Sequence, residues 1–385
     1  MQTATPTITR EEELYWLALR LAPGLGARTS GKLLERFRTP QAIFRASRTE
    51  LEAAGLSGAA AQTIASGCTF EDAASEQGKM AEAGAELVTW SDPRYPAALR
   101  GIFDPPVVLY VRGRTELLRT HQVAVVGTRR PTAYGLAVAE RFSGDLAHAG
   151  LTITSGMARG IDTAAHRGAL AAGGQTVAVL GCGVDVVYPS ENRKLAAEIV
   201  AKGLLVSEFP MGATAFPQNF PIRNRIISGL SLGVLVVEGA QYSGSAITAK
   251  LALDQGKELF AVPGNVTSKA SWGPNLLIKQ GARLVQDWND VVSELPAESR
   301  RHLIEQGKQK ILAETGEKPG PGGPELDATA RRVLEDLAVD VPIHLDNLIE
   351  KIGDTSASEL IAALFELEML GLAKQLPGKN FVKVW

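Results

Sequence analysis

Short apolar segments recur through the middle of the chain and alternate with longer amphipathic segments. The apolar segments predict buried strands at Glu86–Thr89, Val107–Val111, Val123–Val126, Leu151–Thr154, Val177–Leu180, Leu204–Ser207, Val234–Val237 and Leu259–Val262. Helical spacing between several of them predicts helices at Ala137–Ala149, Asp162–Ala172, Arg193–Lys202 and Ile247–Gln255. Because strands that alternate with helices form right-handed crossovers, this pattern predicts an α/β fold with a doubly wound parallel sheet.

The segment before the first strand has helical periodicity throughout. Leucines recur at helical spacing up to Leu21, Pro23–Gly26 breaks the pattern, and Ser30–Phe37 resumes it. Two helices around such a turn resemble a helix-hairpin-helix, whose turn amides bind a DNA phosphate, and Arg28 and Lys32 stand beside the turn. The alternative is a small helical bundle with solvated basic residues, which is the more common origin of so short a motif.

The C-terminal part changes character after a stretch rich in Pro, Gly and charged residues at Ala313–Glu325, which has the composition of a linker. Helical spacing follows at Ala328–Leu337, Leu345–Ile352 and Ser358–Leu370, and two short strands follow at Ala373–Leu376 and Phe381–Val384. In the last helix, apolar side chains recur at Leu360, Leu364 and Leu367. Three helices and a strand pair predict a winged helix.

The third helix of this predicted winged helix is acidic. Between Asp354 and Ala373 the sequence has four carboxylates and no Lys or Arg. DNA phosphates would repel such a helix, because the release of counterions by basic side chains drives binding in the major groove. DNA could be read only through the following strand pair, where Lys374, Lys379 and Lys383 lie, so we favour a protein-contact or regulatory role for this part of the chain.

These patterns divide the chain into four predicted segments. They are a SAM-like or helix-hairpin-helix-like helical domain at residues 10–78, an extended Rossmann-like core at 79–300, a linker at 301–325, and the winged helix at 326–385.

Composition adds two constraints. The formal net charge is −2, so a nucleic-acid partner would need a local basic patch rather than a general basic field. The two cysteines, Cys68 and Cys182, form no C-x-x-C pair, which suits a reducing compartment.

The first residues do not have the pattern of a signal peptide, and no apolar run is long enough for a membrane helix, so we expect a cytoplasmic protein with no membrane partner.

Four segments place Gly, hydroxyl residues or Arg where a predicted strand ends: Val123–Gly135, Ser155–His166, Asn219–Ser231 and Glu238–Lys250. The carboxyl ends of parallel strands meet at one edge of a sheet, so these segments should lie together. Glycines admit a ligand close to backbone N–H groups, helix N-termini favour anions, and arginines bind phosphate through two nitrogens. The pattern predicts a groove for a polyanion.

Two of these segments have different predicted roles, one in binding phosphate and the other in recognising a single strand. Gly127–Arg130 offers backbone donors and two arginines to a phosphate, although one arginine could instead pair with a carboxylate. Phe220 beside Arg223 and Arg225 has the composition of single-strand recognition, in which a base stacks on the ring and arginines follow the phosphates. Core packing is the alternative for Phe220. We expect an extended loop up to Pro221, and solvent-exposed arginines at the start of the helix that follows.

The predicted binding residues for DNA and phosphate are Gly127, Thr128, Arg129, Arg130, Arg159, Phe220, Arg223, Asn224, Arg225, Ser243, Gly244, Ser245 and Lys250. For the last four, an ordinary capped helix with a solvated lysine is the alternative.

Enzymatic and cofactor chemistry have weaker support in the sequence. Gly181–Gly183 begins like a dinucleotide fingerprint, but Val186 occupies its third glycine position, so we expect no NAD site. Asp162 and His166 have a spacing that could hold a metal, yet no third ligand is nearby in sequence. We interpret them as a helix cap and a partner on the same helix face. With no pairing of nucleophile and base, we expect no catalysis, no metal and no cofactor.

The same motifs carry a family resemblance. V-G-T-R-R-P-T-A-Y-G, S-G-M-A-R-G-I-D-T-A-A-H, F-P-x-R-N-R-I-I-S-G-L-S and S-G-S-A-I-T-A, with the lead-in at Asp92–Gly113, resemble the DNA-processing protein A (DprA, or Smf) family from about Glu86 to Leu284. The resemblance implies a cytoplasmic, homodimeric protein of natural transformation. It implies that the protein binds single-stranded DNA, protects it and loads RecA on it. A basic residue frequent in the family before the Phe-Pro pair is missing, since Ala215–Asn219 has no charge.

Two other functions compete with this one. Phosphoribohydrolases of the lysine-decarboxylase-like type share the extended Rossmann topology and carry P-G-G-x-G-T-x-x-E with a catalytic Glu. The similar place here is Ser243–Thr248 followed by Ala249, Lys250 and Leu251, and this missing carboxylate disfavours hydrolysis. A transcriptional regulator that uses the winged helix is disfavoured by the acidic third helix.

Overall fold

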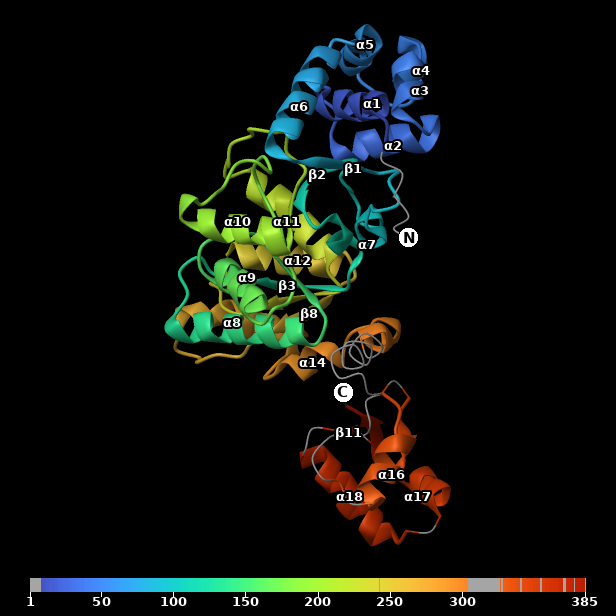
Figure 1. Cartoon of the computed structure of the whole chain (residues 1–385), viewed down its shortest axis with the longest axis vertical. Coiled ribbons are helices and arrows are strands. Elements are labelled where there is room, and N and C mark those ends of the chain that lie inside the picture. The colour runs from blue at the N-terminus through green and yellow to red at the C-terminus, as the bar shows by residue number, and fades with distance from the viewer. Residues whose placement is uncertain are drawn as a thin grey trace. The chain divides into compact units, whose positions relative to one another are not determined.

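The computed structural model describes residues 8–241, 243–303, 326, 328–339, 341–353, 355–369, 372–376 and 378–384 (Figure 1). The chain forms two compact units, residues 1–291 and residues 292–385. Most of the predicted linker at 301–325 lies outside the described residues. The four predicted segment boundaries stay predictions.

The first unit begins with a layer of helices (blue in Figure 1). They are α1 (Arg10–Leu21), α2 (Ala27–Phe37), α3 (Pro40–Arg45), α4 (Arg48–Ala53), α5 (Gly58–Ser66) and α6 (Phe70–Ala83). Hydroxyl residues begin several of them. Thr9 and Glu12 form a reciprocal capping box at the start of α1, which satisfies N–H groups that a helix leaves without partners. The predicted helical N-terminal region is confirmed.

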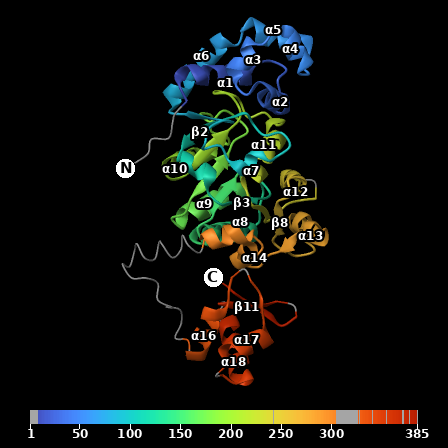
Figure 2. The ribbon, with the colours of Figure 1, turned by 90° about the vertical axis from the view of Figure 1, so that its right-hand side faces the viewer.

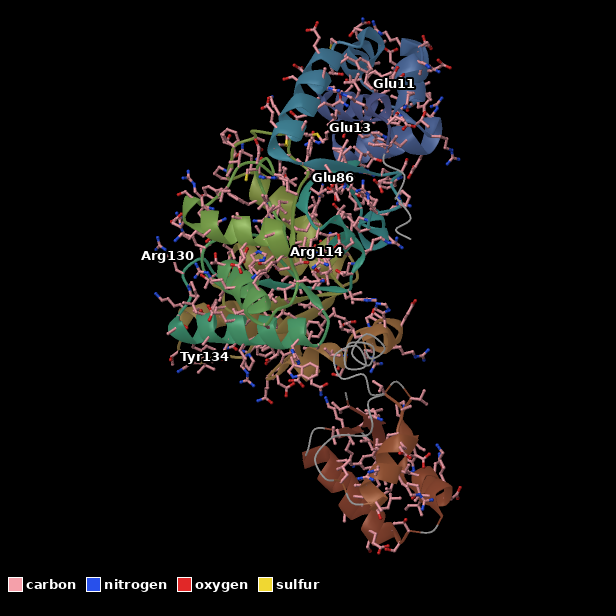
Figure 3. All side chains as sticks on the ribbon, viewed as in Figure 1. Glu11, Glu13, Glu86, Arg114, Arg130 and Tyr134 are labelled. Atoms are coloured by element: carbon pink, nitrogen blue, oxygen red, sulfur yellow. The ribbon has the colours of Figure 1, made fainter. Side chains whose placement is uncertain are left out.

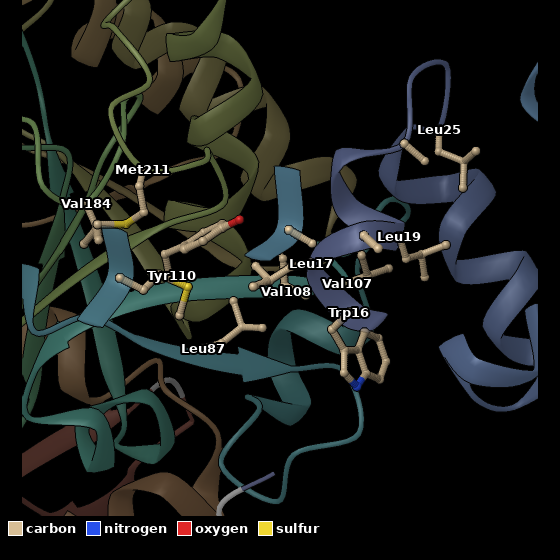
Figure 4. Close-up of a cluster of buried hydrophobic side chains, with 14 of the residues drawn as sticks. Trp16, Leu17, Leu19, Leu25, Leu87, Val107, Val108, Tyr110, Val184 and Met211 are labelled. Atoms are coloured by element: carbon tan, nitrogen blue, oxygen red, sulfur yellow. The ribbon is translucent and has the colours of Figure 1, made fainter. Parts of the chain in front are cut away.

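These helices share a hydrophobic core with the sheet that follows. Leu17 of α1 is fully buried in one cluster with Tyr110 and Met211 (Figure 4). Polar groups cross the same boundary, because Glu76 Oε1 accepts a hydrogen bond from the Met211 N–H at 2.6 Å and Arg20 Nε donates to the Glu208 carbonyl at 3.1 Å. The helical layer is therefore part of the same packed unit as the sheet.

Nine strands form the central sheet in the order β1-β2-β6-β5-β4-β3-β7-β8-β9. Their bounds are β1 (Glu86–Thr89), β2 (Val108–Gly113), β3 (Gln122–Val126), β4 (Thr152–Ser155), β5 (Thr176–Val179), β6 (Leu204–Ser207), β7 (Gly233–Val236), β8 (Glu258–Ala261) and β9 (Arg283–Leu284). From β6 to β9 all neighbours are parallel, as predicted.

The first two strands depart from the parallel direction that the sequence pattern predicted for the sheet. β1 pairs with β2, and β2 with β6, in the antiparallel direction. A buried strand is apolar whichever way it runs, so the sequence pattern did not carry this information. The exposed two-residue strand β9 was not predicted, because its side chains carry no hydrophobic pattern.

Helices cover both faces of the sheet, and the side chains of β5 alternate between the two layers. Val177 and Val179 pack in one cluster with α11 and α12, whereas Ala178 packs in the cluster that contains α10. Figure 2 shows α9 and α10 on one side of the strands and α11 and α12 on the other. The predicted doubly wound arrangement is confirmed.

The remaining elements of this part are α7 (Ala97–Arg100), α8 (Ala133–His148), α9 (Ile161–Ala171), α10 (Arg193–Lys202), α11 (Asn219–Leu230), α12 (Gly244–Asp254), α13 (Trp272–Lys279), α14 (Trp288–Val292) and 3-10 helices at Thr115–Arg119, Ser190–Asn192 and Lys269–Ser271. α8 packs closely on α9 because Gly168 lies against the backbone of Glu140, where a side chain would clash.

The second unit contains α16 (Ala328–Asp336), β10 (Ile343–His344), α17 (Leu345–Ile352), α18 (Ala357–Met369), β11 (Ala373–Leu376) and β12 (Asn380–Lys383). The predicted stripe of Leu360, Leu364 and Leu367 is buried, with Val333 and Leu348 from the other helices. The strands form a small sheet in the order β10-β12-β11, so β10 adds a strand to the predicted pair. Within the described residues, none of the helices combines the length and apolarity needed to span a bilayer.

The carboxylate that joins the helical layer to the sheet predicts a stability effect. Glu76→Ala should lower the free energy of unfolding by about 1–3 kcal/mol, because it leaves a buried Met211 N–H without its acceptor. Glu82→Ala on the exposed side of α6 is the control and should change stability by less than about 0.5 kcal/mol. Urea unfolding of both variants measures this difference, and equal effects would contradict the structural role of Glu76.

Candidate functional site

A cavity of about 590 Å³ opens at the carboxyl ends of β3 and β7, where α8, α11 and α12 begin. Ten of the thirteen predicted binding residues line it, and they are Gly127, Thr128, Arg129, Arg130, Phe220, Arg223, Asn224, Ser243, Gly244 and Ser245. The parallel topology therefore brings all four predicted segments together, although Ser155–His166 contributes only Ala158 and Asp162.

The loop between β3 and α8 is held from below by a buried carboxylate. Glu238, at the end of β7, accepts hydrogen bonds from the Thr132 N–H at 2.9 Å and from the Thr132 hydroxyl at 2.6 Å. Its own carbonyl accepts from the Thr128 N–H at 2.7 Å. Gly127 permits this approach, because a Cβ there would lie 2.8 Å from the Glu238 carbonyl oxygen.

This support leaves the two arginines of the loop available. Arg129 and Arg130 are exposed, and neither is within ion-pair distance of a carboxylate in the described residues. Arg130 projects from the loop ahead of α8 (Figure 3). The alternative considered from the sequence, in which one of these arginines pairs with a neighbouring carboxylate, is therefore absent from the described residues.

Phe220 forms an aromatic platform in the cavity. The ring is half-buried, and the guanidinium carbons of Arg129 and Arg223 lie 5.0 Å and 5.8 Å from its centroid. Tyr188 packs beside it with the ring centroids 5.7 Å apart. The predicted extended loop is wrong here, because α11 begins at Asn219 and a helix tolerates Pro221 in its first turn.

Arg223 lies at the floor of the cavity rather than in solvent. Only 3% of the residue is exposed, and its Nη1 donates to the Val179 carbonyl at 2.9 Å. Gly156 makes room for the guanidinium, since a side chain there would clash with it. Burial lowers the pKa of Arg223 to about 10, and the nearby Asp162 carboxylate opposes this shift. The group thus stays a fixed cation at neutral pH.

Arg225 points away from this cavity, which corrects its predicted place. Residues two apart on a helix differ by about 200°, so Arg223 and Arg225 face opposite sides of α11. Arg225 Nε donates to Asp104 at 3.0 Å and Nη2 donates to Glu208 at 2.6 Å. The sequence pattern did not indicate which face of this helix would meet the cavity, so it did not separate the two side chains.

Two further predicted residues also lie outside the main cavity. Arg159 lines a small adjoining recess with Arg129 and Tyr188, and pairs with Glu191 at 2.6 Å. Both partners are more than half exposed, so the pair contributes little stability and can open to a phosphate. Lys250 lines a separate cavity on the other side of α12.

The start of α12 supplies hydroxyl groups to the cavity wall. Ser243 caps the helix by accepting from the Ala246 N–H at 3.3 Å, and its hydroxyl lies 2.7 Å from that of Ser245. Asn224 Nδ2 donates to the Gly244 carbonyl at 3.4 Å, which ties α11 to α12. The structure therefore shows the capped helix that the sequence predicted, and the capped end of this helix lines the cavity.

Asp162 and His166 are buried below the cavity. Asp162 does not cap α9, because Gly160 precedes the helix and the carboxylate accepts instead from the Gly156 N–H at 3.1 Å. Burial raises the pKa of Asp162, and Arg223 partly offsets that effect. Burial lowers the pKa of His166 to about 3, and its Nδ1 bonds the Thr176 hydroxyl at 2.7 Å. Among the described residues, no group of three or more candidate ligands could hold a metal.

The cavity therefore combines three arginines, backbone N–H groups at helix starts, and the rings of Phe220 and Tyr188. This arrangement is suited to a ligand with several phosphates and an aromatic base. Sequence reasoning missed Glu238 and Tyr188. A carboxylate placed directly after an apolar strand was a usable signal for the first, whereas Tyr188 comes from an irregular segment with no periodicity.

Comparison with known families gives two matches. Residues 86–296 match the model described as DNA recombination-mediator protein A, and residues 317–379 match the one described as DprA winged helix domain.

Individual relatives agree with these family matches. Protein Smf of Escherichia coli is 40% identical over 285 residues, which is 74% of this chain and 74% of that protein. DNA processing protein DprA of Bacillus subtilis is 43% identical over 56% of this chain and 73% of its own length.

Among solved structures, DNA processing protein A from Streptococcus pneumoniae matches 76% of this chain and 99% of its own, with a TM-score of 0.63 and 34% identity. The Helicobacter pylori protein, reported for its single-stranded DNA binding mode, matches 58% of this chain and 98% of its own, with a TM-score of 0.50 and 31% identity.

Buried His166 predicts a pH dependence of stability. Its pKa is about 3 when folded and about 6.5 when unfolded, so the unfolded chain binds the extra proton first. The free energy of unfolding should therefore be highest above pH 6.5 and fall as pH drops toward 3, by roughly 1 kcal/mol over the first pH unit. The raised pKa of Asp162 acts in the opposite direction, because the folded chain then takes up the proton of this carboxyl first.

His166→Gln should reduce this slope, whereas His148→Gln on the exposed end of α8 should retain it. Urea unfolding between about pH 7.5 and about pH 5.5 measures the slope. An unchanged slope in His166→Gln would contradict the burial of a neutral imidazole.

Proposed function

The chain belongs to the DNA recombination-mediator protein A family, and from this premise we propose that its main cavity binds single-stranded DNA in transformation and recombination. The observation that carries the proposal is the pairing of Arg129 and Arg223 with the ring of Phe220 in one cavity. The binding mode reported for the Helicobacter pylori relative supports it.

Each group in the cavity has a separate task in this proposal. Arg129 and Arg130 contact phosphates from the exposed loop, and buried Arg223 adds a fixed charge below them. Phe220 stacks on one base, which any base allows because every base has an aromatic face. Ser243 and the first amides of α12 bind a further phosphate. Binding of this kind is independent of sequence.

We further propose that the protein protects incoming strands and loads RecA on them, acting as a cytoplasmic homodimer. The family resemblance supports these finer points. The cavity chemistry is consistent with them, because its only carboxylate in the lining, Asp162, is already bonded to a backbone amide within the described residues. A strand that is bound without being cut can be passed on intact.

The shortage of carboxylates in the cavity lining also disfavours a phosphoribohydrolase. The region that would carry its catalytic carboxylate is α12, which places Ser245 and Thr248 at the cavity instead. We therefore propose a binding protein without catalytic activity. Incubation with AMP or with single-stranded DNA and Mg²⁺ should release no product, and hydrolysis lost on Asp162→Asn would reject this part of the proposal.

Arginine and aromatic substitutions should have different effects on DNA binding. Arg129→Ala should weaken binding of a single-stranded oligonucleotide and reduce the slope of log affinity against log salt by about one unit, because one phosphate contact is lost. Phe220→Ala should cost about 1–3 kcal/mol of binding free energy with little change of slope, since stacking releases no counterion. Fluorescence anisotropy at several salt concentrations measures both.

Arg141→Ala is the matched control, because Arg141 is 69% exposed on α8 and lies outside the lining of the main cavity. It should leave affinity and slope near those of the wild type. If Phe220→Ala reduced the slope as much as Arg129→Ala, the division of roles would be wrong. If no variant changed affinity, the DNA site would lie elsewhere.

The RecA proposal needs its own assay. The full chain should speed the assembly of RecA filaments on DNA coated with single-strand-binding protein, and should slow digestion of free strands by an added exonuclease. Arg129→Ala should be deficient in both. Protection without any effect on RecA would leave DNA binding intact and reject the loading role.

A further inference from the structure

A second cavity, of about 460 Å³, lies on the opposite side of α11 from the main one. The turn between α1 and α2, the segment before β2 and the outer face of α11 line it. We propose that this cavity is a second subsite for single-stranded DNA, which receives the strand as it leaves the main cavity across the start of α11. The inference rests on the proposed function and extends it.

The start of α2 faces this cavity with backbone N–H groups that no side chain caps within the described residues. Gly26 precedes the helix with no side-chain cap, and no acidic residue stands in its first turn. The first N–H groups of a helix have no partner within it and favour an anion. Gly26, Ala27 and Arg28 all line the cavity.

A buried arginine provides an independent indication of a ligand. Arg225 lines the cavity, is 5% exposed, and uses Nε and Nη2 for Asp104 and Glu208. Its remaining nitrogen, Nη1, has no hydrogen-bond partner among the described residues. A buried donor without a partner is costly, so a ligand or water at this site is expected.

The cavity also repeats the aromatic composition of the main site. Phe103 is 75% exposed, and the guanidinium of Arg28 lies 4.4 Å from its ring centroid. In the main cavity the corresponding distance from Arg129 to Phe220 is 5.0 Å. An exposed ring beside an arginine is the composition that stacks a base while contacting a phosphate.

The charges of the second cavity indicate weak, stacking-dominated binding. Three arginines line it, and two carboxylates, Asp104 and Glu208, oppose them. Both carboxylates accept from Arg225, and Arg20 bonds the Glu208 carbonyl, so Arg28 is the cation left for a phosphate. A single phosphate contact should therefore accompany the ring.

The two cavities are adjacent along α11. Pro221 lines the main cavity, Ile222 lines the second, and both are exposed. Successive helix residues rise by only about 1.5 Å, so a strand crossing this turn passes from one cavity to the other.

The test compares oligothymidylates of increasing length on the full chain, with affinity measured by anisotropy. The shortest strands fill the main cavity alone and should bind Phe103→Ala and wild type equally. Longer strands should bind Phe103→Ala at least about fivefold more weakly. For long strands, Arg28→Gln should reduce the salt slope by about one unit, while Arg45→Gln on α3, exposed and outside the cavity, should not.

The outcomes separate the two proposals. Equal affinity of Phe103→Ala and wild type at every length would overturn the second subsite and leave the main one standing. A loss that is the same for short and long strands would also overturn it, because Phe103 would then act on the main cavity. Failure of the wild type to bind any single strand would reject the proposed function itself.

Discussion

The two buried guanidinium groups of α11 are the constraint around which the site is organised. A charge removed from water must be matched by nearby partners, because an unmatched buried charge is strongly destabilising. Arg223 meets this requirement at the end of β5 through the Val179 carbonyl, and Arg225 meets it through Asp104 and Glu208. One helix is thereby fixed to strand ends on both of its sides, which sets the position of Phe220 in its first turn.

Each wall of the main cavity is tied to another. Glu238 bonds Thr132 across the start of α8, Asn224 bonds Gly244 across the start of α12, and Arg223 lies against Gly156. A wall already held in its bound geometry loses little conformational entropy when a ligand enters. The exposed arginines can then bind flexible phosphates without reorganising the groups beneath them.

Local placement explains how a chain of net charge −2 can present a site for a polyanion. Carboxylates near the arginines are mostly committed: Glu238 to a loop, Asp162 to a backbone amide, Glu208 to Arg225. At physiological salt, charges farther apart than about 8 Å are largely screened, so distant carboxylates matter less to a ligand than the groups of the cavity itself. The shared core of α1, α6 and the sheet holds the helical layer on the sheet, and the start of α2 with Arg28 lines the second cavity beside α11.

By itself, the sequence determined the architecture and most of the site. Apolar runs with the lengths of strands, separated by helical periodicity, are sufficient for a doubly wound sheet, and parallel strands necessarily bring their carboxyl ends together. This reasoning from sequence is enough to place Gly127, Arg129 and Ser243 in one cavity. Periodicity does not record strand direction, so the antiparallel β1 and β2 were missed.

Only the tertiary structure decided where individual side chains point. The packing of α11 against the sheet decides which of its faces meets each cavity, and it sends Arg223 into the main cavity and Arg225 to the other side. The partner that holds Arg225, Asp104, lies 121 residues away in sequence, beyond the reach of any local pattern. Burial and ion pairing arise from contacts between distant segments, and a pattern read along one segment carries no information about them.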